Sequence, residues 1–275
     1  MHRSFNNTYA VKYEYNRKSM QAIDTESKAY LLGWLATDGY IGNDSVVLSL
    51  KDTDSHVIQN MFNNVFGINI PPIKYRTDKR DNTKLASISM YSQELVNDIK
   101  HHLKLQSTDK KTFTVSMPEL ANDKLRWAFL RGVFEGDGTI DSLYTKTALR
   151  LPSGGGLKVR ICSASPKFLS ELQLFMTKYN ITSSILNKKE KRYPNSKLQT
   201  LEISSRYAIV ALRQLYPLNI LPSHRLDRKY EIAIEWIRRF DEISNIAAIQ
   251  FSGSRMLASK KFNIDFKRNN KQLYS

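Results

Sequence analysis

Two segments of the chain, 25–37 and 123–136, are apolar nearly all round the helical period. This pattern predicts two buried helices. Alternating apolar and polar positions follow each of them and predict strands at Ser45–Lys51 and Leu157–Ser163. We therefore expect helices and strands to alternate along the chain.

Two later strands are predicted at 84–92 and 197–205, where one face of each strand is apolar and the other polar. Such strands are typical of a sheet that helices cover on one side only. The polar side of the sheet is then left for water or for a ligand.

The same series of elements occurs twice. Residues 29–39 (AYLLGWLATDG) reappear as 128–138 (AFLRGVFEGDG), and the series helix, hairpin, helix, hairpin, helix follows in both copies. A Pro- and Gly-containing stretch at 144–158 lengthens the first hairpin of the second copy. Beyond it, the residues from Ser49 onward align with those from Ile161. The repeat predicts an α+β chain with two pseudo-symmetric αββαββα units at 25–115 and 116–240, an N-terminal extension at 1–24 and a basic C-terminal extension at 241–275.

Small residues lie four positions apart in both repeated helices, at Gly33 and Thr37 in one and at Gly132 and Gly136 in the other. Two helix backbones can approach closely at such positions, so we expect these helices to pack together across a pseudo-two-fold axis. Each helix ends in Asp-Gly, and we expect the glycine to stop the helix in the left-handed conformation.

The predicted packing brings Asp38 and Asp137 side by side where the strands begin. Neighbouring carboxylates raise each other's pKa unless a cation neutralises them. Hard divalent ions such as Mg²⁺ bind carboxylate and phosphate oxygens and keep several waters. Two carboxylates beside a basic, polar sheet face therefore indicate metal-assisted attack on phosphodiesters. An isolated Asp-Gly is more often a plain turn, but two at the ends of matched helices favour the metal pair.

Composition indicates a polyanionic partner. The 275 residues include 42 Lys and Arg against 26 Asp and Glu, a formal net charge of +16, which favours nucleic acid over an anionic membrane surface. The one cysteine, Cys162, excludes an intramolecular disulfide and a multi-thiolate zinc site. The sequence has neither an apolar run of roughly 18 residues nor the apolar core of a signal peptide. We expect a soluble intracellular protein, of undetermined compartment, that does not bind a membrane.

Basic side chains recur at the same hairpin tip in both copies. The loops 74–84 and 187–197 each carry five Lys or Arg beside a polar sheet face. An isolated charge run is usually a solvated surface, but recurrence beside that face favours phosphate contacts. The residues that we expect to contact nucleic acid are Lys51, Lys74, Arg76, Lys79, Arg80, Lys84, Arg160, Lys188, Lys189, Lys191, Arg192 and Lys197.

The repeated motifs resemble those of a known family. Residues 31–39 (LLGWLATDG) and 130–138 (LRGVFEGDG) are similar to the two motifs of a monomeric LAGLIDADG homing endonuclease, and the repeat covers residues 25–240. The resemblance implies a saddle of antiparallel strands that straddles a long double-stranded DNA target. It also implies a monomer, since one chain supplies both motifs, and cleavage across the minor groove that leaves short 3′ overhangs.

The resemblance further implies metal ligands. The penultimate acids of the motifs, Asp38 and Asp137, are expected to bind two or three Mg²⁺ ions shared between them, and a further backbone ligand at position 37 stays unidentified. The first motif departs from the family pattern with Ala36 where an acid is common, whereas the second keeps Glu135. That position is usually not a metal ligand, so the departure does not argue against cleavage.

The resemblance also implies a basic or polar residue from each half near the scissile phosphates. The candidates are Lys111 in the first half and either Arg225 or Lys229 in the second. The residues that are candidates to orient water are Ser49 or Lys51 in the first copy and Arg160 in the second.

The predicted function is that of a site-specific DNA endonuclease that makes metal-dependent double-strand breaks in a long asymmetric target, as in homing. One alternative is an RNA maturase that helps its own intron to fold, and another is a sequence-specific DNA-binding protein of the same fold that does not cleave. A third alternative is a basic protein that coats nucleic acid without sequence preference. The presence of both Asp38 and Asp137 argues against lost cleavage and leaves a double role open.

Overall fold

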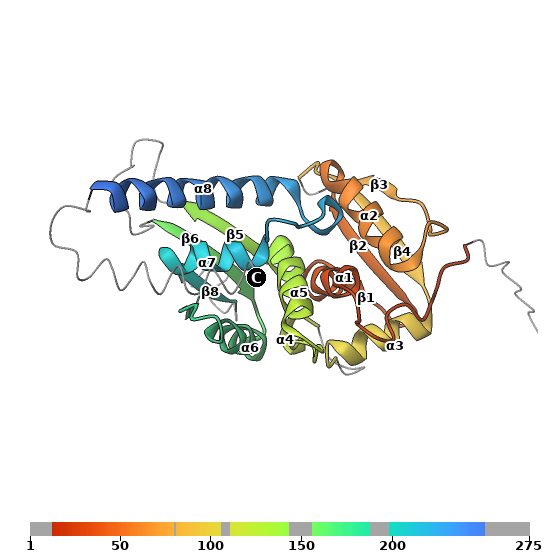
Figure 1. Ribbon diagram of the computed structural model, residues 1–275. Coiled ribbons are helices and arrows are strands. Elements are labelled where there is room, and N and C mark those ends of the chain that lie inside the picture. Colours follow the sequence, from red (N-terminus) through yellow and green to blue (C-terminus); the bar gives the residue numbers. More distant parts are fainter. Residues whose placement is uncertain (1–12, 80, 106–110, 143–155, 188–197, 251–275) are drawn as a thin grey trace, which may run out of the picture.

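The computed structural model describes residues 13–79, 81–105, 111–142, 156–187 and 198–250, and its elements form two units (Figure 1). The first contains α1 (Glu26–Thr37), β1 (Tyr40–Ile41), β2 (Ser45–Lys51), the 3₁₀ turn η1 (Asp52–Asp54), α2 (Ser55–Phe66), β3 (Lys74–Thr77), β4 (Lys84–Tyr91) and α3 (Gln93–His102). A helical turn, α4 (Lys111–Thr114), leads to the second unit.

The second unit repeats this order. It contains α5 (Asp123–Asp137), β5 (Gly138–Ser142), β6 (Leu157–Ser163), α6 (Pro166–Thr177), β7 (Ser184–Asn187), β8 (Gln199–Ser204) and α7 (Arg206–Leu215). The 3₁₀ turn η2 (Pro222–His224) and the long helix α8 (Asp227–Gln250) follow. The predicted αββαββα series is therefore confirmed in both units.

Each unit has one four-stranded antiparallel sheet, with the strand orders β1-β2-β4-β3 and β5-β6-β8-β7. In β4, Ala86, Ile88 and Met90 are fully buried, while the residues between them lie on the more exposed face. Helices α2 and α3 contact the first sheet, and α6 and α7 contact the second. The predicted α+β arrangement, with one apolar and one polar sheet face, is confirmed.

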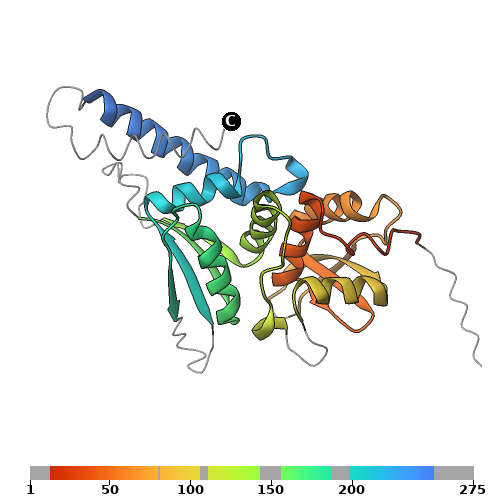
Figure 2. The same cartoon turned by 60° about the horizontal axis from the view of Figure 1, so that its bottom comes forward.

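Helices α1 and α5 lie side by side between the two units, as both ribbon views show (Figures 1 and 2). Glycines allow the backbones to touch: a Cβ at Gly33 would lie 2.1 Å from Phe129 O, and one at Gly132 would lie 2.2 Å from Tyr30 O. No larger side chain fits at either position. The close packing predicted from the small residues is thus confirmed.

The prediction of left-handed glycines at the ends of these helices is wrong. Gly138 has φ −93° and ψ 158°, and Gly39 also lies outside the positive-φ region. Glycine is required at both positions because there is no room for a Cβ atom. A Cβ at Gly39 would lie 2.6 Å from Leu35 Cα, and one at Gly138 would lie 2.4 Å from Phe134 O. The glycines let each chain turn directly from helix to strand against the last helical turn.

Helix α8 runs along one side of the second unit, where it packs on α7 and β5 (Figure 1). The expected end of the second unit at residue 240 falls within this helix, which continues to Gln250. Residues 251–275 of the basic C-terminal extension lie outside the described residues. Within the described part of the chain, no helix has both the length and the apolar character required to cross a membrane.

Candidate active site and nucleic-acid interface

The two motif helices end at the same place, and each end carries an aspartate. Asp38 follows α1 as its C-cap, and Asp137 is the last residue of α5. Thr37 and Asp38 pack against Gly136, where a Cβ would lie 2.1 Å from Thr37 Oγ1 and 3.2 Å from Asp38 Oδ2. The structure therefore brings together two acidic residues that are far apart in the sequence.

Electrostatics of this pair favour a bound cation. Both aspartates reach solvent, yet the surrounding protein removes enough water to raise both pKa values. The pKa of Asp137 rises to about 6, first through desolvation and then through the charge of Asp38. Desolvation also raises the pKa of Asp38, while Lys111 and Lys229 oppose the rise. Two carboxylates in this situation titrate as a pair, and a cation between them would favour the doubly ionised form.

Lys111 lies beneath the end of α1. Its Nζ donates hydrogen bonds to Leu35 O at 3.0 Å and Thr37 O at 2.6 Å, and also to Gly39 O. An ammonium group at this position satisfies carbonyls that have no partner within the helix and lies at the negative end of the helix dipole.

Lys229 occupies the equivalent position at the end of α5. Its Nζ donates to Phe134 O at 2.8 Å, Glu135 O at 2.8 Å and Gly138 O at 2.6 Å. The two lysines reach these positions from different elements, α4 and α8. The site is thus nearly two-fold symmetric, with one aspartate and one lysine at the end of each motif helix.

Burial changes the acid–base character of both lysines. Desolvation lowers the pKa of Lys111 and of Lys229 to about 8, although the charges of Asp38 and Asp137 oppose the shift. At neutral pH both remain predominantly protonated, and both lose their proton in mildly alkaline solution.

The polar face of the first sheet presents basic side chains in register. Residues directly opposite each other across antiparallel strands share a face. Leu85 of β4 lies opposite both Lys51 and Arg76, and Ser87 lies opposite Lys74. Lys51, Lys74 and Arg76 therefore lie on the same, outer face, and all three are exposed.

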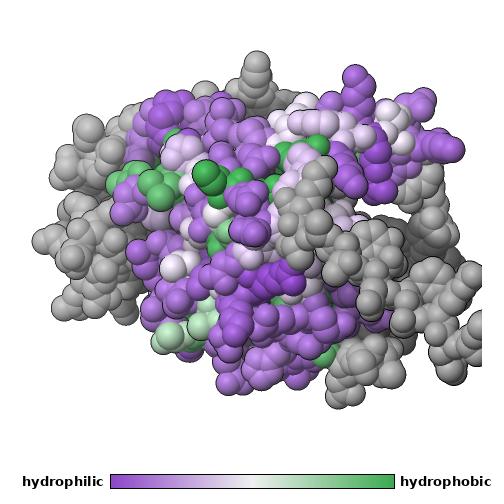
Figure 3. All heavy atoms as spheres, turned by 90° about the vertical axis from the view of Figure 1, so that its right-hand side faces the viewer, coloured by the Kyte–Doolittle hydropathy of each residue, from purple (hydrophilic) through white to green (hydrophobic). Residues whose placement is uncertain are grey.

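The remaining basic residues predicted for this hairpin are placed differently. Lys84 pairs with Thr77 and so belongs to the opposite face, although its position at the strand end leaves it exposed. Lys79 is exposed in the turn, and Arg80 lies outside the described residues. Figure 3 views the molecule from the end formed by the first unit, where hydrophilic residues cover most of the surface.

The outer face of the second sheet carries an ion-pair network. Arg160 contacts Glu202 at 2.8 Å and also Asp141, and Lys158 contacts Glu202 at 2.8 Å. Its basic side chains are thus partly neutralised within the protein. The other predicted contacts of this half lie outside the described residues, namely Lys188, Lys189, Lys191, Arg192 and Lys197.

Strand pairing also fixes the register between the copies. Tyr40 pairs with Val47 in the first unit, and Thr139 pairs with Arg160 in the second, so Arg160 corresponds to Val47. The predicted alignment of Ser49 with Ile161 is therefore wrong by one residue. One extra residue in the hairpin loop, where sequence similarity is weak, accounts for the difference.

Part of the chain is similar to a known family. A family described as a LAGLIDADG-like domain matches residues 124–216, which span α5 to α7. A search of curated proteins finds no match.

Solved structures of LAGLIDADG proteins are similar to the chain at low identity. Mesophilic variants of the homing endonuclease I-DmoI are 16% identical, with 72% of this chain and 96% of theirs covered and a TM-score of 0.43. I-DmoI in complex with DNA and Mn is 17% identical, with 74% and 100% covered and a TM-score of 0.42. Full-length DUF199/WhiA from Thermatoga maritima is 14% identical, with 85% and 72% covered and a TM-score of 0.44.

The position two residues before each aspartate carries an acid in only one of the two helices, and that acid has a structural role. Glu135 is fully buried, accepts a hydrogen bond from Leu226 N at 2.8 Å, and also accepts one from the Tyr30 hydroxyl. It thereby joins α1 and α5 to the residue just before α8. Its counterpart Ala36 is buried and apolar.

Of the two basic candidates in the second half, only Lys229 matches Lys111. Arg225 instead contacts Asp227 at 3.0 Å, and its guanidinium stacks 3.7 Å from the centre of the Tyr230 ring. Sequence reasoning did not select Arg228, which contacts Asp54 at 3.2 Å and opposes the pKa rise of Asp38. The only sequence feature that pointed to Arg228 was its position within the basic segment 225–229.

The aspartate pair fits a hard divalent ion better than an all-protein metal site. In the described residues, no three or more His, Cys, Asp or Glu side chains group as a metal site would require. Mg²⁺ is commonly held by one or two carboxylates together with substrate phosphates and water. Asp38 and Asp137 supply that donor set, and their raised pKa values give a reason for the site to favour a cation.

Proposed function

We propose that the chain is a site-specific DNA endonuclease that makes divalent-metal-dependent double-strand breaks. The observation that carries the proposal is the two-fold repetition of one aspartate and one lysine at the ends of α1 and α5. Two equivalent sets of groups suit a reaction performed twice, once on each strand of a duplex. One chain supplies both sets, so the proposed active form is a monomer.

In this proposal, Asp38 and Asp137 would hold Mg²⁺, which when bound supplies Lewis-acid activation of the phosphodiester. Lys111 and Lys229 keep their ammonium groups beside the aspartates through the carbonyls that they cap. As fixed positive charges in a partly desolvated site, they would stabilise the negative charge that develops on the phosphate oxygens. They also lower the cost of keeping both carboxylates ionised.

The two sheets suggest how a long target would be bound. The outer face of the first sheet carries exposed Lys51, Lys74 and Arg76, whereas the second carries Arg160 within an ion-pair network. Side chains on the two faces differ, so the two half-sites that they read would differ as well. This asymmetry supports the proposal of an asymmetric target, as a homing enzyme uses.

A cleavage assay tests the proposal. The substrate is duplex DNA made by joining the two sequences that flank the insertion containing the gene, incubated with Mg²⁺ at several pH values. We expect cutting of both strands by the wild type, and binding without cutting by Asp38→Asn and Asp137→Asn. Asp44→Asn, which changes an exposed carboxylate away from the helix ends, is the matched control and should cut normally.

Two results would overturn the proposal. Specific binding without cutting by the wild type would favour the non-cleaving DNA-binding protein or the RNA maturase. Metal-dependent cutting retained in both aspartate variants would remove the aspartate pair from the reaction.

A further inference from the structure

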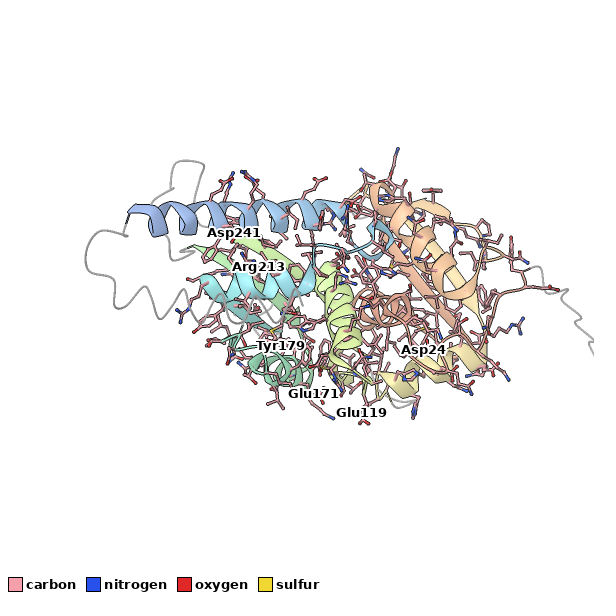
Figure 4. All side chains as sticks on the ribbon, viewed as in Figure 1. Asp24, Glu119, Glu171, Tyr179, Arg213 and Asp241 are labelled. Carbon is pink, nitrogen blue, oxygen red and sulfur yellow. The ribbon has the colours of Figure 1, made fainter. Side chains whose placement is uncertain are left out.

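A cavity lies along α5, away from the aspartate pair. It is a cavity of about 480 Å³, and residues that line it include Trp127, Arg131, Tyr179, Arg213, Ile220 and His224. Figure 4 places Tyr179 at the end of α6 and Arg213 on α7, both in the second unit. None of Asp38, Asp137, Lys111 and Lys229 lines it. Its volume is in the range of small-molecule sites.

Arg131 is the unusual residue of this cavity. It is only 2% exposed, and its Nη1 donates to Leu215 O at 3.1 Å. Its Nε and Nη2 have no hydrogen-bond partner among the described residues. A buried cation with unsatisfied donors is costly unless a partner of opposite charge is supplied.

The neighbouring carboxylates are already engaged. Glu26 pairs with Lys124 at 2.9 Å, and Asp123 accepts from the Tyr179 hydroxyl at 2.8 Å. In the described part of the chain, no carboxylate lies within ion-pair distance of Arg131.

Glu135, one turn further along α5, is also engaged. It attracts Arg131 electrostatically, but its two oxygens accept from Tyr30 and Leu226. The protein therefore leaves one edge of the Arg131 guanidinium unpaired. Both nitrogens of this edge are covered by protein in this structure, so the guanidinium must turn toward the cavity for a ligand to reach them.

That edge has a specific chemistry. Nε and Nη2 lie on the same side of the guanidinium, and this side holds a carboxylate or a phosphate through two parallel hydrogen bonds. Trp127 and Ile220 add apolar surface beside it. We propose that this cavity binds a small organic anion, with its carboxylate or phosphate on Arg131 and its apolar part against Trp127.

The test uses three probes at constant ionic strength: benzoate, phenyl phosphate and inorganic phosphate. We expect benzoate or phenyl phosphate to raise the Tm of the wild type in a saturable way, by about 5 °C at ~100 times its Kd. Comparison of the first two probes shows which anionic group is preferred. A rise with inorganic phosphate equal to that with phenyl phosphate would contradict the apolar contact.

Three variants assign the effect to the cavity. Arg131→Met should lose the Tm rise and, because it removes a buried unpaired charge, should be at least as stable as the wild type without probe. Arg131→Lys keeps the charge but not the two parallel donors, and should weaken binding at least tenfold. Arg239→Met, which changes an exposed arginine of α8 that does not line the cavity, is the matched control and should respond like the wild type.

The fluorescence of Trp127 gives an independent readout. Binding should change the tryptophan emission in the wild type, and Trp127→Phe should lose that change but keep the Tm rise. The proposal is overturned if no probe gives a saturable Tm rise in the wild type. It is equally overturned if Arg131→Lys responds as the wild type does.

Discussion

Burial controls the charge of the residues at the end of the motif helices. It raises the pKa of Asp137 to about 6 and lowers those of Lys111 and Lys229 to about 8. Between these values the carboxylate and both ammonium groups are charged at once. A site that needs a metal ligand and two fixed cations is therefore complete only over about two pH units.

Cleavage should accordingly follow a bell-shaped pH profile with its maximum between pH 6 and 8. Below pH 6, Asp137 is protonated and no longer attracts a metal ion. Above pH 8, the lysines lose the charge that caps the helix ends, and the rate should fall by roughly tenfold per pH unit. Single-turnover rates measured from pH 5 to 10 at a fixed, subsaturating Mg²⁺ concentration check this, because saturating Mg²⁺ would itself hold Asp137 ionised, and a rate still rising at pH 10 would contradict it.

The symmetry of the lysines predicts a strand-specific defect. Lys229→Met should slow cleavage of one strand by about 10²-fold and leave the other strand nearly unaffected, so nicked DNA should accumulate. Lys111→Met should produce the complementary nick. Arg225→Met, which changes a residue stacked on Tyr230, is the control and should cut both strands. The measurement is denaturing electrophoresis of DNA labelled separately on each strand.

The raised pKa of Asp137 also predicts a change in stability. The pKa of Asp137 is raised on folding, so the stabilising effect of its protonated form is present below its unfolded pKa and is lost as the pH rises through about 6. Without metal, Asp137→Asn should then be more stable than the wild type at pH 8, by about 1 kcal/mol after allowance for solvent screening. The two proteins should be equally stable below the unfolded pKa. Urea unfolding at pH 8 and pH 3.5 measures both differences.

At the scale of elements, one buried carboxylate links the two halves of the site. Glu135 accepts hydrogen bonds from Tyr30 of α1 and from Leu226, which precedes α8 by one residue. Lys229 follows in the first turn of α8, and its own N–H bonds to Leu226 O at 3.0 Å. The position of Lys229 thus depends on Glu135, whereas Lys111 has no equivalent support from Ala36.

Glu135→Ala should therefore affect the two strands unequally. We expect a loss of about 2 kcal/mol in the free energy of unfolding, because two buried donors lose their acceptor. We also expect roughly tenfold slower cleavage of the strand that depends on Lys229. Glu135→Gln keeps an acceptor for Leu226 and should restore most of the rate. Equal slowing of both strands in Glu135→Ala would indicate a general loss of structure instead.

The repeat and the periodicity predicted the elements well, because local pattern determines them. The close packing at Gly33 and Gly132 was predictable for the same reason. The choice of Lys229 over Arg225 was not, since it depends on how α8 meets the end of α5. The partners of Glu135 likewise come from elements that only the tertiary structure brings together.

At the scale of the whole molecule, the described strands of the two sheets differ in how far their basic side chains are paired with acids. On the first sheet Lys74 and Arg76 face outward on an edge strand whose four residues are all exposed. On the second, Glu202 holds both Lys158 and Arg160, and Asp141 holds Arg160 as well. Phosphates bound to the second sheet would compete with these internal carboxylates.

This difference predicts unequal salt dependence of DNA binding. Arg76→Ala should reduce the slope of log K against log[salt] by about 0.9, the value for one phosphate contact. Arg160→Ala should reduce the slope by less, because Glu202 and Asp141 already neutralise that guanidinium.

Glu202→Gln should have the opposite effect. It releases Lys158 and Arg160 to contact phosphates and should make the slope steeper. Fluorescence anisotropy of labelled DNA at KCl concentrations on the order of 0.1 M, where the Debye length is about 10 Å, measures the slopes. Equal reductions for Arg76→Ala and Arg160→Ala would show that the ion-pair network opens when DNA binds.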